Sequence, residues 1–437
     1  GIIDEWRRPK PEFWNVKKAY SPVRLLETQV TKFEAGKPLS LPIQNRFDHT
    51  TLDQVTMRVS YDGKTQELPC PPIQPHQKGT IELPAAAWKA GTEVALSFLD
   101  SAKRLIDDDR ITLGTPPKPE APALKGTPEV VETDSVITIE GKEFGVVIDR
   151  ATGLIQSLQH GTASVPLVGP MPHIFKLHEF LKVGINPDIG NVPSTVGKIS
   201  IYDSPLLDAW KFQDLRIEKK DNAAVVHVTG QFDGFDAAYT YSIAANGRID
   251  IGYDFKNLPP LDTTGMVPKS GDPLDLEVGI KFRTGDQFDH LHWDKKAYWS
   301  SYPEGHLGNS KGSIALFSSD KPVWAQKPTQ PWNKDVWDFY LMGWPVPEGK
   351  LLTYEASAAR QALRTFTLDD REANLALTIY GDGEATTARY GQFKDNQYYL
   401  YLLDTLDYAL RWGNYSANNR PAPNHEGVAR ISLEELD

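Results

Sequence analysis

The sequence predicts an all-β protein made of two successive sandwiches of antiparallel strands. Short stretches in which apolar and polar residues alternate recur along most of the chain, and this period of two is typical of half-buried strands. Glycine and proline, 33 of each among 437 residues, are more frequent than a helical protein tolerates and suit strands joined by turns. A chain of this length needs more than one hydrophobic core, so at least two domains are expected.

Composition excludes several classes of function. A formal net charge of −11 makes nucleic acid an improbable partner, because phosphate binding needs a basic surface. No run of about 18 apolar residues exists, so no membrane span is predicted. The single cysteine, Cys70, cannot form an internal disulfide or a thiolate metal cluster, and we expect it to be a small buried residue. No metal site and no cofactor are predicted.

Residues 1–20 predict a loop followed by a short helix. Pro11 stands where a helix can start, and Phe13, Val16 and Tyr20 recur at helical spacing. The segment is too short to fold alone, and the chain starts at Gly1 without a leader sequence. We therefore interpret residues 1–20 as the end of a larger domain that precedes them.

Residues 21–114 predict a sandwich of short strands. Val55, Met57 and Val59 alternate with polar residues, and Asp62-Gly63 then supplies a hairpin turn. About 90 residues of short strands with frequent turns are typical of an immunoglobulin-like sandwich. We expect the acidic run from Asp107 to Asp109 to be a solvated turn between strands.

Residues 115–132 predict a linker between domains. Five prolines occur between Thr115 and Pro128, with few apolar residues among them. Such a composition favours a stiff, extended chain.

Residues 133–437 predict one large antiparallel sandwich. The strongest short hairpin signal of the chain is Asn246-Gly247. A helix is expected only over Gln397–Leu410. The predicted strands are Val136–Ile139, Phe144–Asp149, Leu154–Leu158, Ala223–Val228, Ala238–Ile243, Ile249–Phe255, Leu276–Phe282 and Leu375–Tyr380.

Four stretches, in the same order, resemble the C-terminal region of family 2 glycoside hydrolases, the β-galactosidase and β-glucuronidase group. Gly1–Pro11 resembles the exit from the catalytic barrel of that family. Ile43–Leu52 is similar to a signature of the sandwich that follows the barrel. Phe144–Leu158 and Leu291–Gly308 are similar to the opening and to a tryptophan loop of the last domain, a galactose-mutarotase-like β-supersandwich. The resemblance covers essentially the whole chain.

The chain departs from the family pattern at two loops of this last domain. An Arg-Ala-Pro-x-Asp-Asn-Asp stretch is replaced by Lys176–Gly190. A late Gly-Gly-Asp-x-Ser-Trp loop, which in the family supplies a tryptophan to the sugar pocket, is absent. Trp412 lies at a comparable distance from the C-terminus. These departures concern the choice of sugar more than the fold.

The resemblance implies a non-catalytic role for this part of the hydrolase. Retaining glycosidases use two carboxylates about 5 Å apart, and in the family both are glutamates of the barrel, which precedes these residues. The chain also lacks the alternation of strands and helices that builds such a barrel. No catalytic residue is therefore assigned, and the expected partners are carbohydrate and the catalytic barrel of the same enzyme.

Sugar contact is predicted for an aromatic loop and one distant tryptophan. Aromatic faces beside polar groups on a loop are typical of saccharide sites, whereas Trp293, in an alternating strand, is expected in the core. The predicted substrate-binding residues are Trp299, Tyr302, Glu304, His306 and Trp412.

Other interpretations remain open at this point. The chain could be a stand-alone carbohydrate-binding module, or the small subunit of a two-chain β-galactosidase. Use of a mutarotase-like fold as an epimerase or lyase is a further class, but we locate no histidine with a general-base glutamate for it. The expected location is periplasmic or extracellular, with the cytoplasm as the alternative.

Overall fold

The protein is described by a computed structural model in which the chain divides into two compact units. Unit 1 comprises residues 1–118 and 297–310, and unit 2 comprises residues 119–296 and 311–437. The structure describes residues 2–3, 7, 9, 11–115, 120–176, 209–232, 234–258, 276–296, 302, 309–316, 362–392, 397–404 and 425–436.

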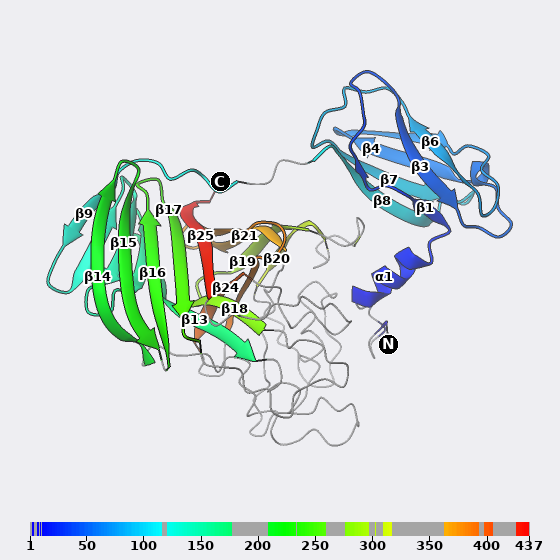
Figure 1. Cartoon of the computed structure of the whole chain (residues 1–437). Helices are drawn as coiled ribbons and strands as arrows, with labels where there is room; N and C mark the ends of the chain where they lie inside the picture. Colours follow the sequence, from blue (N-terminus) through cyan, green and yellow to red (C-terminus); the bar gives the residue numbers. More distant parts are fainter. Residues whose placement is uncertain are drawn as a thin grey trace, which may run out of the picture. The chain divides into compact units, whose positions relative to one another are not determined.

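Unit 1 is one helix followed by a two-sheet sandwich (Figure 1). One sheet has the strand order β1-β3-β6, and the other has the order β2-β8-β7-β4-β5. The elements are α1 (Pro11–Ala19), β1 (Val23–Leu25), β2 (Gln29–Val30), β3 (Leu39–Asn45), the 3-10 turn η1 (Leu52–Gln54), β4 (Thr56–Tyr61), β5 (Lys64–Pro69), β6 (Lys78–Leu83), β7 (Glu93–Leu99) and β8 (Leu105–Leu113).

The alternation in these strands builds the core of unit 1, as predicted. Met57, Val59 and Leu96 are buried between the sheets, and Cys70 is only 4 % exposed. Burial raises the pKa of the Cys70 thiol to about 12. The hairpin of β4 and β5 turns through Asp62 and Gly63, both at positive φ.

Unit 2 contains two large antiparallel sheets. One has the order β23-β24-β18-β13-β12-β11-β10-β9, and the other has the order β14-β15-β16-β17-β25-β22-β21-β19-β20. The strands are β9 (Glu129–Glu132), β10 (Val136–Glu140), β11 (Phe144–Asp149), β12 (Ile155–His160), β13 (Ala163–Lys176), β14 (Lys211–Lys220), β15 (Ala223–Phe232), β16 (Phe235–Ile243), β17 (Arg248–Lys256), β18 (Leu276–Thr284), β19 (His290–Lys295), β20 (Lys311–Ala315), β21 (Leu363–Asp370), β22 (Leu375–Tyr380), β23 (Thr387–Gln392), β24 (Tyr398–Leu403) and β25 (His425–Glu435).

The two sheets of unit 2 share one hydrophobic core. Strands β14 to β17 lie side by side (Figure 1), and their inward side chains, such as Tyr239 and Ile251, meet those of β11 and β12, such as Ile148. Trp293 is 3 % exposed in this core, as expected. The Asn246-Gly247 hairpin joins β16 to β17, with Gly247 at φ +83°. The all-β fold with antiparallel sheets is therefore confirmed.

The predicted linker is partly built into unit 2. Its last four residues form β9, which pairs with β10. Upstream of β9, the Asn246 side chain donates to the carbonyl of Ala123 and accepts from the amide of Lys125, and Thr127 donates to the carbonyl of Asp221. The segment thus lies along two hairpin tips of the nine-stranded sheet.

Two local expectations are wrong. The helix expected from Gln397 is the strand β24 over its described part, because Tyr398–Leu403 lies between β18 and β23 and is buried on both faces. The run Asp107–Asp109 lies within β8 and is not a solvated turn. Asp107 and Asp109 are each only 2 % exposed, because they lie on the inward face of β8, where both carboxylates pair with Lys18 of α1.

Candidate functional site

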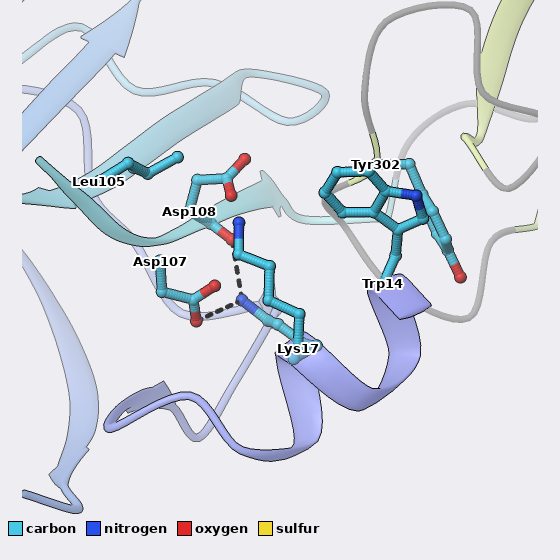
Figure 2. Close-up of a pocket in the computed structure, with 7 residues that line it drawn as sticks. Trp14, Lys17, Leu105, Asp107, Asp108 and Tyr302 are labelled. Atoms are coloured by element: carbon cyan, nitrogen blue, oxygen red, sulfur yellow. Dashed lines mark hydrogen bonds and ion pairs between the residues drawn. The ribbon is translucent and has the colours of Figure 1, made fainter. Parts of the chain in front are cut away.

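A small pocket of unit 1 lies where helix α1 faces strand β8. Its volume is 160 Å³. Trp14 and Tyr302 present their rings at one end, and the aspartates of β8 lie at the other (Figure 2). The lining residues are Trp14, Lys17, Lys18, Leu105, Asp107, Asp108 and Tyr302.

Lys18 fixes the helix to the strand at the floor of the pocket. Its Nζ lies 2.9 Å from Asp107 Oδ2 and 2.6 Å from Asp109 Oδ1, and it donates to the carbonyl of Asp108 at 2.8 Å. An ammonium group has three protons, so these contacts use all of its donors. The residues sit there because alternate residues of β8 point inward and Lys18 is in the last turn of α1.

The aromatic end of the pocket is held by polar contacts. Tyr302 Oη donates to Asn15 Oδ1 at 2.9 Å, which ties it to the helix. The Lys17 ammonium lies 5.6 Å from the centre of the Trp14 ring, within the range of a cation–π contact. Phe13 packs edge-on against Trp14 with centroids 5.1 Å apart. Leu105, half exposed, adds an apolar wall.

This arrangement can bind a small polar ligand, and one of its carboxylates is already engaged. Retaining glycosidases need two carboxylates free to flank the scissile bond. Asp107 is engaged by Lys18 and buried, so its carboxylate cannot take that part. The rings, the Lys17 ammonium and the aspartate oxygens can instead stack on and hydrogen-bond to a small polar ligand.

One of the predicted site residues lies in this pocket. Tyr302 lines it, and its contact with sugar stays a prediction. Trp299, Glu304, His306 and Trp412 lie outside the described residues.

The other residues of the pocket are not among the predicted sugar contacts. Trp14 is absent from them, and the acidic run of β8 is expected in a turn from sequence. The available signal was the alternation of Asp107, Asp109 and Ile111, which continues the inward face of β8. Nothing local in the sequence indicates that Tyr302 meets Asn15, 287 residues away.

Unit 2 carries a buried basic and aromatic cluster on one face of its eight-stranded sheet. The pairing of β13, β18, β24 and β23 aligns Met171, Lys281, Tyr401 and Arg389 in one row. Side chains of directly paired residues share a face. Arg389 lies 5.4 Å from the Tyr401 ring, and the ring of His173 packs edge-on against Tyr401 at 4.9 Å. The first contact places a buried cation, Arg389, on an aromatic face.

A second polar group of unit 2 joins its two sheets. His425 Nε2 lies 2.7 Å from Asp404 Oδ2, and Tyr253 also hydrogen-bonds to Asp404. Burial, with the charge and hydrogen bond of Asp404, raises the pKa of the Tyr253 phenol well above its ordinary value. A Cβ at Gly427 would lie 2.3 Å from Tyr253 Oη, so only glycine permits this approach. Tyr253 therefore stays protonated and acts as a donor.

A histidine–aspartate pair lies on the outer face of the nine-stranded sheet. His292 Nε2 lies 2.6 Å from Asp369 Oδ2, with the imidazole about half exposed and the carboxylate buried. Among the described residues, no group of three or more His, Cys, Asp or Glu side chains is arranged to hold a metal ion. Within the residues that the structure describes, no helix is long and apolar enough to cross a membrane.

Comparison with known proteins gives only weak likenesses. No protein-family model matches the chain, and no curated protein matches it. A galactose 1-epimerase from Lactobacillus acidophilus is 8% identical, with a TM-score of 0.33 over 71% of this chain and 99% of its own. A galactose mutarotase-like protein from Clostridium acetobutylicum is 11% identical, with a TM-score of 0.30 over 71% of this chain and 98% of its own.

An α-mannosidase from Enterococcus faecalis is similar over a longer part of the chain. It is 11% identical, with a TM-score of 0.35 over 95% of this chain and 43% of its own. The chain thus spans less than half of that enzyme. None of these TM-scores reaches 0.5, so the likenesses do not define a family for this protein.

Proposed function

We propose that this chain is the β-rich, non-catalytic part of a glycoside hydrolase of the β-galactosidase kind, and that it contacts carbohydrate through the pocket of Trp14 and Tyr302. This class of protein is proposed because four stretches of the chain resemble family 2 hydrolases and follow one another in the same order. Such a part would support the catalytic barrel and contribute to binding of terminal β-linked sugars. That the sandwich of unit 2 has a galactose-mutarotase-like fold is part of the same proposal.

One observation carries the sugar-binding part of this proposal. Tyr302, which the sequence singles out for sugar contact, lies in one pocket with a tryptophan, two lysines and two aspartates. Rings with a few polar groups around them are what a pyranose needs, because its C–H face stacks on aromatics and its hydroxyls hydrogen-bond. The volume of 160 Å³ is below the about 300 Å³ at which pockets for drug-sized ligands begin. A single sugar ring is therefore the ligand size proposed for it, and not an oligosaccharide.

Calorimetric titration of the 437-residue chain tests this site. Methyl β-galactoside, β-glucoside and β-mannoside are the ligands. Tyr302→Ala and Trp14→Ala should each raise the Kd of the bound glycoside by about tenfold, because each removes a stacking ring. Tyr20→Ala is the control, since Tyr20 follows α1, is 81% exposed and does not line the pocket. Unchanged affinity in both ring variants would refute the site.

Hydrolysis is a separate test of the class. The chain alone and the product of the full-length gene are incubated with chromogenic β-galactosides, β-glucosides, β-glucuronides and β-mannosides. We expect turnover by the full-length product alone, because the carboxylate pair is assigned to the barrel. Turnover by the 437-residue chain would place a catalytic pair within it and end the non-catalytic assignment.

A further inference from the structure

We infer that His290 and His292 bind one divalent transition-metal cation, of the zinc and copper class, on the outer face of the nine-stranded sheet. This site belongs to unit 2 and does not depend on the sugar pocket proposed in unit 1. Neither histidine is among the sugar contacts predicted from sequence.

The two imidazoles lie on the same side of strand β19. Residues two apart on a strand point to one face, and Leu291 between them is buried in the core, so both rings are directed outward. Their ring centres are 6.2 Å apart, with planes inclined by 34°. Two imidazoles bound to one ion through nitrogens about 2 Å from it have ring centres about 5–6 Å apart. A small side-chain rotation therefore lets both rings reach the same cation.

Asp369 determines which nitrogen of His292 can bind the metal. Its Oδ2 lies 2.6 Å from Nε2, and a carboxylate only accepts, so in the neutral ring Nε2 carries the proton and Nδ1 the lone pair. The imidazole is 49% exposed and the carboxylate 7%, so the ring is held by a buried group while solvent reaches it. Metal-binding histidines commonly donate their other ring N–H to a carboxylate in this way.

Two buried polar atoms beside the rings lack a hydrogen-bond partner. His290 Nδ1 and Asp369 Oδ1 are both buried, and neither is hydrogen-bonded within the described part of the chain. The register of β19 and β21 places these two residues directly opposite each other. Unpaired buried polar atoms cost free energy. A cation bound here, or its coordinated water, would offset that cost.

The donor set determines the class of cation. Imidazole nitrogens suit zinc, copper and nickel, whereas magnesium and calcium prefer oxygen ligands. Among the described residues no three His, Cys, Asp or Glu side chains are grouped to hold a metal, so water occupies the positions that the two rings leave. Asp369 supplies a negative charge beside the ion, and the cation nearest to that carboxylate in charge terms, Arg371, is already paired with Asp289 at 2.6 Å. Copper should bind more tightly than zinc, following the usual order for such ligands.

Calorimetric titration of the untagged 437-residue chain with zinc chloride tests the site. His290→Gln and His292→Gln should each raise the Kd of the same single zinc equivalent by at least about tenfold, because each removes one of two protein ligands. His292 is half exposed, so His292→Gln keeps the fold. The matched control is His227→Gln on the same sheet. His227 lies 3.6 Å from Glu218, and the residues two positions away on its strand are not histidines.

Electron paramagnetic resonance with one equivalent of Cu²⁺ counts the ligands directly. We expect two coordinated nitrogens in the wild-type chain and one in each of the two variants, with His227→Gln unchanged. Absence of zinc binding would overturn the site, as would binding that neither substitution weakens. An equal loss in His227→Gln would also overturn it, because the effect would then not depend on the histidine pair. Sugar binding in unit 1 is unaffected by any of these results.

Discussion

A single carboxylate, that of Asp382, organises the turn between β22 and β23. It accepts hydrogen bonds from the backbone amides of Glu384, Ala385 and Thr386 and from the Thr386 hydroxyl. Partial burial acts to raise the pKa of Asp382, but the hydrogen bonds outweigh it and hold this pKa below the ordinary value of 3.8. The charged form is thus the one that the folded turn prefers.

The lowered pKa predicts an acid-sensitive contribution to stability. Because the folded pKa lies below the unfolded one, the contribution is present above about pH 4 and is lost as pH falls through the folded pKa. Asp382→Asn should therefore reduce the free energy of unfolding more at pH 7 than at pH 3. Urea unfolding of unit 2 at both pH values measures this, and Asp134→Asn at an exposed bend is the control. An equal loss at both pH values would contradict the prediction.

At the scale of elements, helix α1 depends on one buried ion-pair cluster. The side chain of Lys18 is 12% exposed, and the side chains of its partners Asp107 and Asp109 are 3% and 2% exposed. Removing one partner of a buried pair leaves charge without compensation, which costs about 3–5 kcal/mol. Lys18→Met should therefore loosen both α1 and the start of β8.

Hydrogen exchange followed by mass spectrometry checks this at peptide level. Peptides from α1 and β8 should exchange faster in Lys18→Met, while peptides from β4 keep their protection. Lys17→Met is the matched control, because it removes a cation–π contact, worth roughly 0.5–1 kcal/mol where solvent has access, and leaves the ion pairs of Lys18 in place. Equal exchange in the two variants would show that Lys18 does not anchor the helix.

Elements were predictable where one face of a strand is buried, and less so elsewhere. β22 and β11 have the bounds that alternation gives, because their side chains face a core on one side. β24 has no alternation, since both of its faces are buried, and its run of tyrosines and leucines suits a helix equally well. The start of β8 was not predicted as a strand, because Asp107 and Asp109 place two charges on its inward face. Their partner Lys18 is distant in the sequence, 89 residues from Asp107.

The candidate site was less predictable than the fold for the same reason. Tyr302 could be named from a cluster of aromatics within ten residues, which is a local signal. Its meeting with Trp14 and the aspartates depends on contacts between distant segments of unit 1. A period of two predicts which face of a strand is buried, but not which other segment covers it.

At the scale of the whole molecule, each of the two units has a large hydrophobic core of its own among the described residues. Leu96 is fully buried in the core of unit 1, and Ile251 is fully buried in the core of unit 2. A domain with its own core can unfold as its own cooperative unit. The unfolding of this chain should therefore show two transitions instead of one.

Matched cavity variants test that expectation. Leu96→Ala and Ile251→Ala each remove buried methyl groups and should cost about 2–5 kcal/mol in the unit that contains them. Hydrogen exchange should rise in β7 and its neighbours for Leu96→Ala, and in β17 and its neighbours for Ile251→Ala, with the other unit unchanged. Faster exchange in both units from either substitution would mean that they unfold together. If each substitution instead speeds exchange only in its own unit, the pocket of unit 1 can be studied by substitution without disturbing the sandwich of unit 2.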